Sequence, residues 1–197
     1  MIESLLRERR ALLSGHFLLS SGLHSGQYVQ CARLFENSRD GERIGAALAR
    51  LAPPAAQVVV SPALGGILPG YETARALGTP FLFTERSGGE MELRREFRVE
   101  PGQKALIVED VLTTGRSTRE VAETVSLRGA VPIGVLSVID RGGGKDTGLP
   151  ARSLLSLPLE TFAPENCPLC ARGLPLEKPG SRAMSAPPRP REKETEC

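Results

Sequence analysis

The chain has 197 residues, of which 40% are hydrophobic and 24% are charged, which suits one domain with a real core plus small appendages. A net charge of +2 and an aromatic content of 4%, without tryptophan, argue against nucleic-acid binding through bulk charge or base stacking. No apolar run approaches the roughly 18 to 20 residues that cross a bilayer, the N-terminus is too charged for a signal peptide, and four irregularly spaced cysteines do not form a secreted disulfide framework, so we expect a cytoplasmic protein without membrane contact.

The N-terminal residues predict a helix followed by a small lobe of strands and turns. Apolar residues recur at helical spacing over 2–14, with charges between them, which is typical of an amphipathic helix. Residues 17–30 then place serines and glycines between two short extended pieces, a pattern that suits strands and turns better than a core element. Within this stretch, His24 is interpreted either as a surface turn residue or as a ligand contact.

A helix and a strand–loop–helix unit follow. Ser38 or Asp40 can cap a helix that runs to about Leu51. Residues 57–60 predict a buried strand, and a helix reaching Leu77 comes after the sequence SPALGG. Glycines at the carboxyl end of a strand let backbone amides approach an anion, although the same sequence also suits an ordinary turn. The candidate anion contacts are Ser61, Leu64, Gly65 and Gly66. The chain lacks both G-x-G-x-x-G and G-x-x-x-x-G-K-[ST], which removes the signatures of dinucleotide-binding and P-loop proteins.

The next strand is expected at residues 80–84, before a polar hairpin over 85–97 that turns at Ser-Gly-Gly. A solvated hairpin is the ordinary explanation of its charges. Its three arginines can also bind a diphosphate, because a guanidinium offers paired donors to phosphate oxygens. These residues are Arg86, Arg94 and Arg95.

Residues 104–117, which read KALIVEDVLTTGRS, contain the strongest local pattern of the chain. A short apolar run predicts a strand buried on both faces, which Glu109 and Asp110 close. A loop of small hydroxylated residues then leads into a helix from Ser117 to about Arg128, which Gly129 ends. Backbone N–H groups at a helix N-terminus favour a phosphate, and the two carboxylates can bind a sugar diol or a Mg²⁺ shell.

Residues 132–140 predict another buried strand, and 152–159 the last one. Asp140 and Arg141 end the first of these strands, at the edge where parallel sheets bind ligands, although they could also form a structural ion pair. The glycine run 142–144 is interpreted as a flexible connector. The alternation of strands and helices predicts an α/β fold with a twisted, mostly parallel sheet, helices on both faces and a small N-terminal hood.

Cys167 and Cys170 form a single C-x-x-C motif after the last strand. A structural zinc takes four ligands, so two more would have to come from elsewhere in the chain, with Cys31 and Cys197 as candidates, or from a second subunit. A reversible disulfide and two unliganded cysteines are the alternatives. We therefore divide the chain into a helix and hood over 1–35, an α/β core over 36–160, a C-x-x-C extension over 161–182 and a tail over 183–197 whose composition predicts disorder.

The segment EDVLTTGRS resembles the phosphoribosyl diphosphate (PRPP) binding motif of the type I phosphoribosyltransferases. The pattern F-x-L-S-S-G-x-x-S-x-x-Y over residues 17–28 resembles the hood of the orotate phosphoribosyltransferases, and the arginine hairpin and Asp140-Arg141 fit the same branch. This resemblance covers about residues 5 to 160. It has two departures, because many members carry a lysine where this chain has His24, and most have lysine and histidine in the hairpin, which here is similar to a shorter arginine-based variant.

The resemblance implies transfer of the ribosyl 5-phosphate group from PRPP to orotate, giving orotidine 5′-phosphate and diphosphate in UMP synthesis, with Mg²⁺ as cofactor in a homodimer. It implies a PRPP site made of Glu109, Asp110, Val111, Leu112, Thr113, Thr114, Gly115, Arg116 and Ser117. It further implies catalytic roles for Asp110 and the three hairpin arginines, a diphosphate loop at 61–66, orotate contacts from Thr113 and Arg141, and hood contacts from Ser21, Gly22 and His24, with Mg²⁺ held mainly by substrate and assisted by Glu109 and Asp110.

Two other functions remain open at this point. A purine phosphoribosyltransferase would share the central motif but often carries a carboxylate at the place of Thr113. A regulator of the same fold that binds PRPP or a nucleotide without catalysis would usually add a DNA-binding module or lose the catalytic loop, whereas this chain keeps a basic hairpin.

Overall fold

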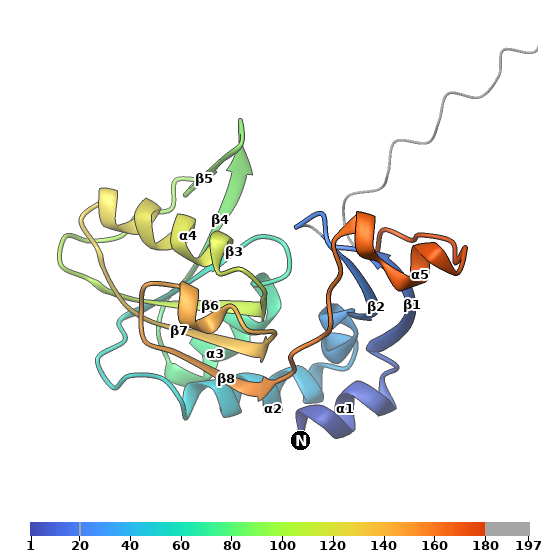
Figure 1. Cartoon of the computed structure of the whole chain (residues 1–197). Coiled ribbons are helices and arrows are strands. Elements are labelled where there is room, and N and C mark those ends of the chain that lie inside the picture. Colours follow the sequence, from blue (N-terminus) through green and yellow to red (C-terminus); the bar gives the residue numbers. More distant parts are fainter. Residues whose placement is uncertain (20, 180–197) are drawn as a thin grey trace, which may run out of the picture. The chain divides into compact units, whose positions relative to one another are not determined.

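A computed structural model describes residues 1–19 and 21–179 (Figure 1), so the tail expected over 183–197 and Cys197 lie outside the described residues. The chain forms two compact units. Among the described residues, the core unit consists of 1–12 and 31–159, and the hood unit consists of 13–19 and 21–30 together with 160–179. The hood therefore differs from the one expected over residues 1–35, because the chain beyond the last core strand supplies its second half.

The core unit is built on a six-stranded sheet in the order β5-β4-β3-β6-β7-β8. Its central strands are continuous apolar runs that are buried on both faces, as expected of parallel strands covered by helices. All neighbouring pairs are parallel except β4 and β5, which form the hairpin. The strands are β3 (Val58–Pro62), β4 (Phe81–Ser87), β5 (Glu90–Glu92), β6 (Lys104–Leu112), β7 (Val131–Asp140) and β8 (Ala151–Ser156).

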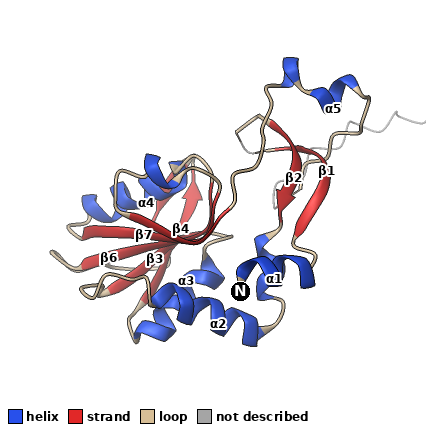
Figure 2. Ribbon diagram, turned by 60° about the horizontal axis from the view of Figure 1, so that its bottom comes forward, coloured by secondary structure: helices blue, strands red, loops and turns tan. Residues whose placement is uncertain are grey.

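Helices cover both faces of this sheet (Figure 2). Helix α4 packs on one face, where its Val121 and Val125 are fully buried among core residues of β3, β6 and β7, as their one-turn spacing predicts. Helices α2 and α3 lie on the other face. The helices of the core unit are α1 (Ile2–Glu8), α2 (Ser38–Ala49), α3 (Ile67–Leu77) and α4 (Arg116–Leu127), with short 3-10 turns at Cys31–Phe35 and Gly144–Asp146. The predicted α/β fold with a mostly parallel sheet is confirmed.

The hood unit pairs the two ends of the chain. Strands β1 (Leu12–Leu18) and β2 (His24–Val29) form a two-stranded sheet. The later segment, with a 3-10 turn at Pro164–Asn166 and helix α5 (Pro168–Ala171), bridges to them at two points, Phe17 with Glu177 and His24 with Phe162. Both ends of the chain therefore contribute to the hood.

The predicted N-terminal helix over 2–14 is too long. The structure ends it at Glu8, and Arg10 adopts a left-handed backbone with φ of 48°. Leu12 and Leu13 then begin β1 instead of continuing the apolar face of the helix. Another boundary also moves, because the side chain of Asn37, rather than Ser38 or Asp40, accepts the capping hydrogen bond of α2 from the Arg39 N–H.

Among the described residues, no helix is both long enough and apolar enough to span a membrane.

Candidate active site

Three loops follow the carboxyl ends of neighbouring parallel strands in the core unit. Strands β3, β6 and β7 are paired side by side, so the segments 61–66, 109–117 and 140–144 leave the same edge of the sheet. The sequence predicted that strand β6 ends at the two acids, Glu109 and Asp110. In the structure β6 continues to Leu112, which pairs with Asp140 of β7. The sheet thus brings together the three segments that contain the predicted contacts to anions and to the base.

The two adjacent carboxylates experience different environments. Glu109 is buried, and this burial, together with the charge of Asp110, raises the pKa of Glu109 well above its usual value. One of its oxygens accepts a hydrogen bond from the Asp110 N–H at 3.2 Å. Asp110 is only half-buried, and its Oδ1 accepts the Val111 N–H at 2.8 Å. Glu109 therefore resists ionisation, and Asp110 is the more accessible of the two carboxyl groups.

The glycine loop after β3 lies directly against Asp110. A Cβ atom on Gly65 would stand 2.5 Å from Asp110 Oδ2, which is closer than real Cβ contacts. Only glycine allows this approach, so the loop and the acid delimit one small space. The peptide between Ala63 and Leu64 is cis, and the Leu64 side chain is exposed. Ser61 differs from expectation, because its hydroxyl is buried within β3 and faces Gly70 of α3, not the loop.

The loop before α4 has the features of an anion site. Gly115 takes a left-handed backbone with φ of 65°, and no side chain among the described residues caps the helix. Thr113 and Thr114 are exposed and Ser117 is partly exposed, whereas Leu112 is a core residue that can offer only its backbone. The loop thus presents backbone and hydroxyl donors at a positive helix terminus.

The glycine run 142–144 supports this loop and is not a flexible connector. A Cβ on Gly143 would lie 2.5 Å from the carbonyl oxygen of Thr113. The Asp140 carboxylate shapes the run by accepting the N–H groups of Gly142 at 2.8 Å and Gly144 at 3.1 Å. Asp140 is therefore a structural residue at the end of β7.

Arg141 follows Asp140 at this edge. Its backbone N–H donates to the Leu112 carbonyl at 2.8 Å, so the Arg141 backbone lies beside the start of the Thr113 loop.

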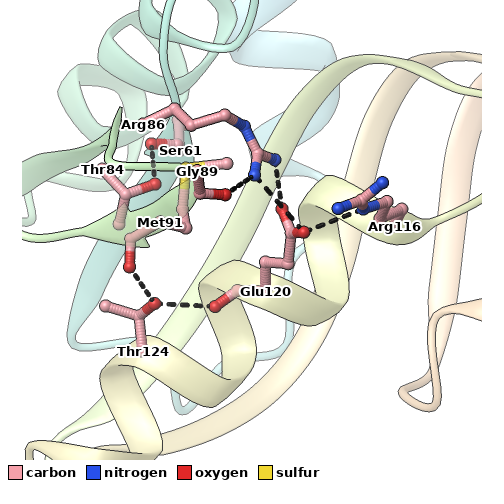
Figure 3. Close-up of polar contacts among 8 residues, drawn as sticks. All are labelled: Ser61, Thr84, Arg86, Gly89, Met91, Arg116, Glu120 and Thr124. Atoms are coloured by element: carbon pink, nitrogen blue, oxygen red, sulfur yellow. Dashed lines mark hydrogen bonds and ion pairs between the residues drawn. The ribbon is translucent and has the colours of Figure 1, made fainter. Parts of the chain in front are cut away.

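Arg86 at the end of β4 is held by an acid of α4 (Figure 3). Its guanidinium donates to Glu120, to which Arg116 also donates from Nε at 2.9 Å, and to the Gly89 carbonyl in the hairpin turn. Burial alone would raise the pKa of Glu120, but the hydrogen bonds and charges of the two arginines outweigh it and lower that pKa. Glu120 is not among the residues predicted from the sequence, although its spacing of four residues from Arg116 is a recognisable helix pair.

Arg94 and Arg95 do not lie on the hairpin as predicted. The hairpin ends at Glu92, and both arginines are exposed in the loop that follows. Arg95 adopts φ of 58° and folds back, so that its guanidinium binds both oxygens of Glu85 at 2.9 and 3.0 Å and lies over the Phe83 ring. These contacts raise the pKa of Arg95.

The three predicted hood contacts differ in their exposure to solvent. Ser21 and Gly22 are exposed between β1 and β2. His24 is buried in β2, so its interpretation as a surface turn residue is wrong. Cys31, a candidate partner of the C-x-x-C pair, belongs instead to the core unit, where it is buried with its Sγ 4.0 Å from the Asp110 carbonyl.

Comparisons with known proteins identify the family of the chain. Residues 33–147 match the family described as the phosphoribosyl transferase domain. The chain is 52% identical over 186 residues to the orotate phosphoribosyltransferase of Thermotoga petrophila, which covers 93% of this chain and 100% of that protein. It is 50% identical over 182 residues to the orotate phosphoribosyltransferase of Carboxydothermus hydrogenoformans, covering 90% and 95%.

Solved structures show the same fold. The orotate phosphoribosyltransferase of Aeropyrum pernix superimposes with a TM-score of 0.68 at 24% identity, over 80% of this chain and 94% of that chain. The Mycobacterium tuberculosis orotate phosphoribosyltransferase in complex with PRPP gives a TM-score of 0.59 at 26% identity, over 79% and 88%. With a domain match over more than half of its length and relatives about 50% identical along nearly all of theirs, the chain belongs to the orotate phosphoribosyltransferase family.

Proposed function

We propose that this chain transfers the ribosyl 5-phosphate group from PRPP to N1 of orotate, giving orotidine 5′-phosphate and diphosphate. The observation that carries the proposal is the closeness of three elements at one sheet edge: the acid pair near the carboxyl end of β6, the glycine loop against Asp110 and the open N-terminus of α4. An anion loop, a diol acceptor and a second anion loop are what a phosphorylated sugar with a diphosphate leaving group requires. The names of the relatives supply orotate as the acceptor.

In this proposal the loop from Thr113 to Ser117 binds the 5-phosphate through backbone N–H groups and hydroxyls. Asp110 accepts hydrogen bonds from the ribose hydroxyls, and Glu109 contacts the same hydroxyls beside it, with a pKa that burial and the charge of Asp110 raise. The loop at Gly65 and Gly66 offers N–H groups to the diphosphate. The bond from ribose C1′ to the diphosphate oxygen breaks as the bond to orotate N1 forms, and the N1 proton passes to water or to the departing diphosphate, so no strong base from the protein is needed.

Mg²⁺ fits this donor set. The half-exposed Asp110 carboxylate is a hard oxygen ligand beside a cradle that a Cβ on Gly65 would fill. When bound, Mg²⁺ would neutralise charge that builds up on the leaving diphosphate. Asp110 would assist it from the protein side, whereas the raised pKa makes Glu109 a weaker ligand.

The arginines would stabilise the leaving group. Arg86 and Arg95 are each held by a carboxylate, Glu120 and Glu85 respectively. A diphosphate is a more highly charged partner than either acid, so its arrival can draw a guanidinium from the carboxylate and close the loop over the site. Arg94 is exposed beside Arg95 and is the third candidate. Thr113 and Arg141 would contact orotate, where the guanidinium suits a carboxylate or carbonyl oxygen.

The remaining features of the proposal come from the family. We propose a cytoplasmic homodimer, with Ser21 and Gly22 as the hood contacts to substrate. His24 is withdrawn from that set because its side chain is buried within the hood.

One assay tests the reaction against its alternatives. Loss of orotate absorbance is followed with PRPP and Mg²⁺, and hypoxanthine and adenine replace orotate in parallel. Turnover with orotate alone supports the proposal. Turnover with a purine would indicate a purine phosphoribosyltransferase, against which the exposed Thr113 argues because it offers no carboxylate. PRPP binding without turnover of any base would indicate a non-catalytic regulator.

Two variants test the roles. Asp110→Asn and Arg95→Ala are each expected to lower turnover about 100-fold or more, with unchanged circular dichroism, because each removes charge from the reacting groups. Near-normal turnover in both would exclude these roles.

A further inference from the structure

Four metal-ligand side chains converge in the hood unit. They are His16 of β1, His24 of β2, and Cys167 and Cys170 at the start of and within α5. One ligand atom from each lies within 4.8 Å of all the others. The two histidines are the only ones in the 197-residue chain, and the two cysteines form its only C-x-x-C. The cluster belongs to a different unit from the PRPP site and does not depend on the proposed function.

The distances between ligand atoms match a tetrahedron around zinc. With Zn–N about 2.05 Å and Zn–S about 2.3 Å, tetrahedral ligands stand about 3.3 Å apart for two nitrogens and about 3.6 Å apart for a nitrogen and a sulfur. In the hood, His16 Nε2 lies 3.0 Å from His24 Nδ1. Cys167 Sγ lies 3.5 Å from His16 Nε2, and Cys170 Sγ lies 3.7 Å from the same atom and 3.4 Å from His24 Nδ1. The set is already near ligand spacing.

The orientation of His16 is fixed from outside the cluster. Its Nδ1 lies 2.9 Å from the carbonyl oxygen of Leu174, which can only accept, so Nδ1 carries the proton and donates it. In the neutral ring, Nε2 then presents its lone pair to the cluster. A ligating histidine whose other nitrogen donates to a backbone carbonyl is the arrangement that orients imidazoles at metal sites.

The backbone also holds the ligands in place. The N–H and carbonyl groups of His24 pair with Phe162 at 2.8 Å each, and the His16 carbonyl accepts the Glu177 N–H at 2.8 Å. The C-x-x-C turn is closed by hydrogen bonds from the Ala171 N–H to the Cys167 carbonyl at 3.1 Å and from the Gly173 N–H to the Cys170 carbonyl at 2.9 Å. Backbone hydrogen bonds therefore hold the residues that carry the four ligand side chains.

Simpler explanations account for only part of the cluster. A hydrogen bond between the two imidazoles would explain their approach but not the two sulfurs beside them. A disulfide would use both thiols but gives no reason for the histidines, and both cysteines are free in the structure. His16, His24 and Cys167 are buried, so the cluster removes several polar groups from water in a unit with little apolar core.

We propose that the hood binds one zinc ion through His16 Nε2, His24 Nδ1, Cys167 Sγ and Cys170 Sγ. Two thiolates and two imidazoles suit zinc, and four protein ligands leave no open position for a substrate, so the site is structural. Both thiols lose their protons on binding, which leaves a neutral site with two negative ligands around a dication. The ion joins β1 and β2 to the C-terminal segment. The C-x-x-C motif thus finds its missing ligands in the hood, not at Cys31.

The first test measures metal in the full-length protein. Elemental analysis after purification without chelator should find about one zinc per chain. After removal of zinc, Co²⁺ should give the intense visible bands of tetrahedral cobalt together with a thiolate-to-cobalt charge-transfer band. A weak octahedral spectrum, or a protein that holds no zinc and forms a Cys167–Cys170 disulfide, would overturn the proposal. This measurement needs no variant and so does not depend on whether a mutant folds.

Variants then assign the ligands. Cys170→Ser, at the exposed ligand, should lose most of the zinc. In the cobalt form it should weaken the charge-transfer band, because only one of the two thiolates remains. Cys31→Ala is the matched control, because it removes a thiol of the same chain outside the cluster and should keep the full zinc content. A chelator should lower the melting temperature of the parent and of the Cys31→Ala protein but leave Cys170→Ser unchanged. Equal zinc content in all three proteins would refute the assignment.

Discussion

Substituting Gly65 by alanine tests the closeness of the glycine loop to Asp110. The added Cβ would stand 2.5 Å from Asp110 Oδ2 and 2.7 Å from its Cγ, so the gap must open by at least 0.5 Å to reach the 3.0 Å that real contacts keep. Because Gly65 is exposed, the loop can move without disturbing the core, and the free energy of unfolding should fall by no more than about 1 kcal/mol. Catalysis is more sensitive, since a misplacement of about 1 Å can cost about 100-fold.

We therefore expect Gly65→Ala to lower kcat/KM for PRPP by about 10- to 100-fold, which corresponds to about 1.4 to 2.7 kcal/mol of transition-state binding. The assay is orotate consumption at varied PRPP, with thermal denaturation alongside. Gly26→Ala is the matched control, because its Cβ would meet only the Leu169 side chain at an ordinary 3.8 Å. If Gly65→Ala kept kcat/KM within twofold of the parent, the loop and Asp110 would not act on the same substrate group.

Three further predictions concern residues around the site. Because the pKa of Glu109 is raised, the folded state binds a proton that the unfolded state has lost, so the free energy of unfolding should fall as pH rises above the ordinary glutamate pKa of about 4.3. Glu109→Gln should remove this fall. In urea titrations at pH 7, the ligand-free variant should be more stable than the parent. The pKa of Glu120 is lowered, so its contribution to stability is present above the ordinary glutamate pKa and is lost as pH falls below it. Glu120→Gln should lower the free energy of unfolding by about 1 kcal/mol or less at pH 7 and weaken the dependence of stability on pH in acid. It should also release the guanidinium of Arg86. Gly143→Ala would place a Cβ 2.5 Å from the Thr113 carbonyl, so calorimetry should show PRPP affinity falling by about 10-fold, and unchanged affinity would mean that the glycine run does not support the phosphate loop.

The sequence predicted the core unit well because its signals are local. The runs in β3, β6 and β7 are apolar on both faces, which only a covered parallel sheet explains, and the two valines of α4 are one turn apart. The positions of the loops after β3 and β6 could be predicted for the same reason, since a strand end, small residues and a helix start are adjacent in sequence.

The errors arise where side chains meet across the sequence. Nothing near Gly143 says that it packs against Thr113, and nothing near Arg86 says that Glu120 of another element binds it. The hood shows the same limit, because its serine- and glycine-broken strands have no period that points to a partner. One compositional signal did exist: a single C-x-x-C in a chain whose only two histidines lie eight residues apart in the hood.

The hood has a consequence for the order in which the protein can assemble during translation. Of its ligand side chains, His16 is synthesised 151 residues before Cys167. At about 5–20 residues per second, β1 and β2 would wait roughly 8–30 s on the ribosome before the segment that bridges to them and its cysteines are made. The core unit, whose last strand β8 ends at Ser156, can reach its native sheet first. The nascent chain should therefore gain the structure of the core unit before that of the hood, so a message truncated after β8 would yield a folded core whose β1 and β2 lack the C-terminal segment.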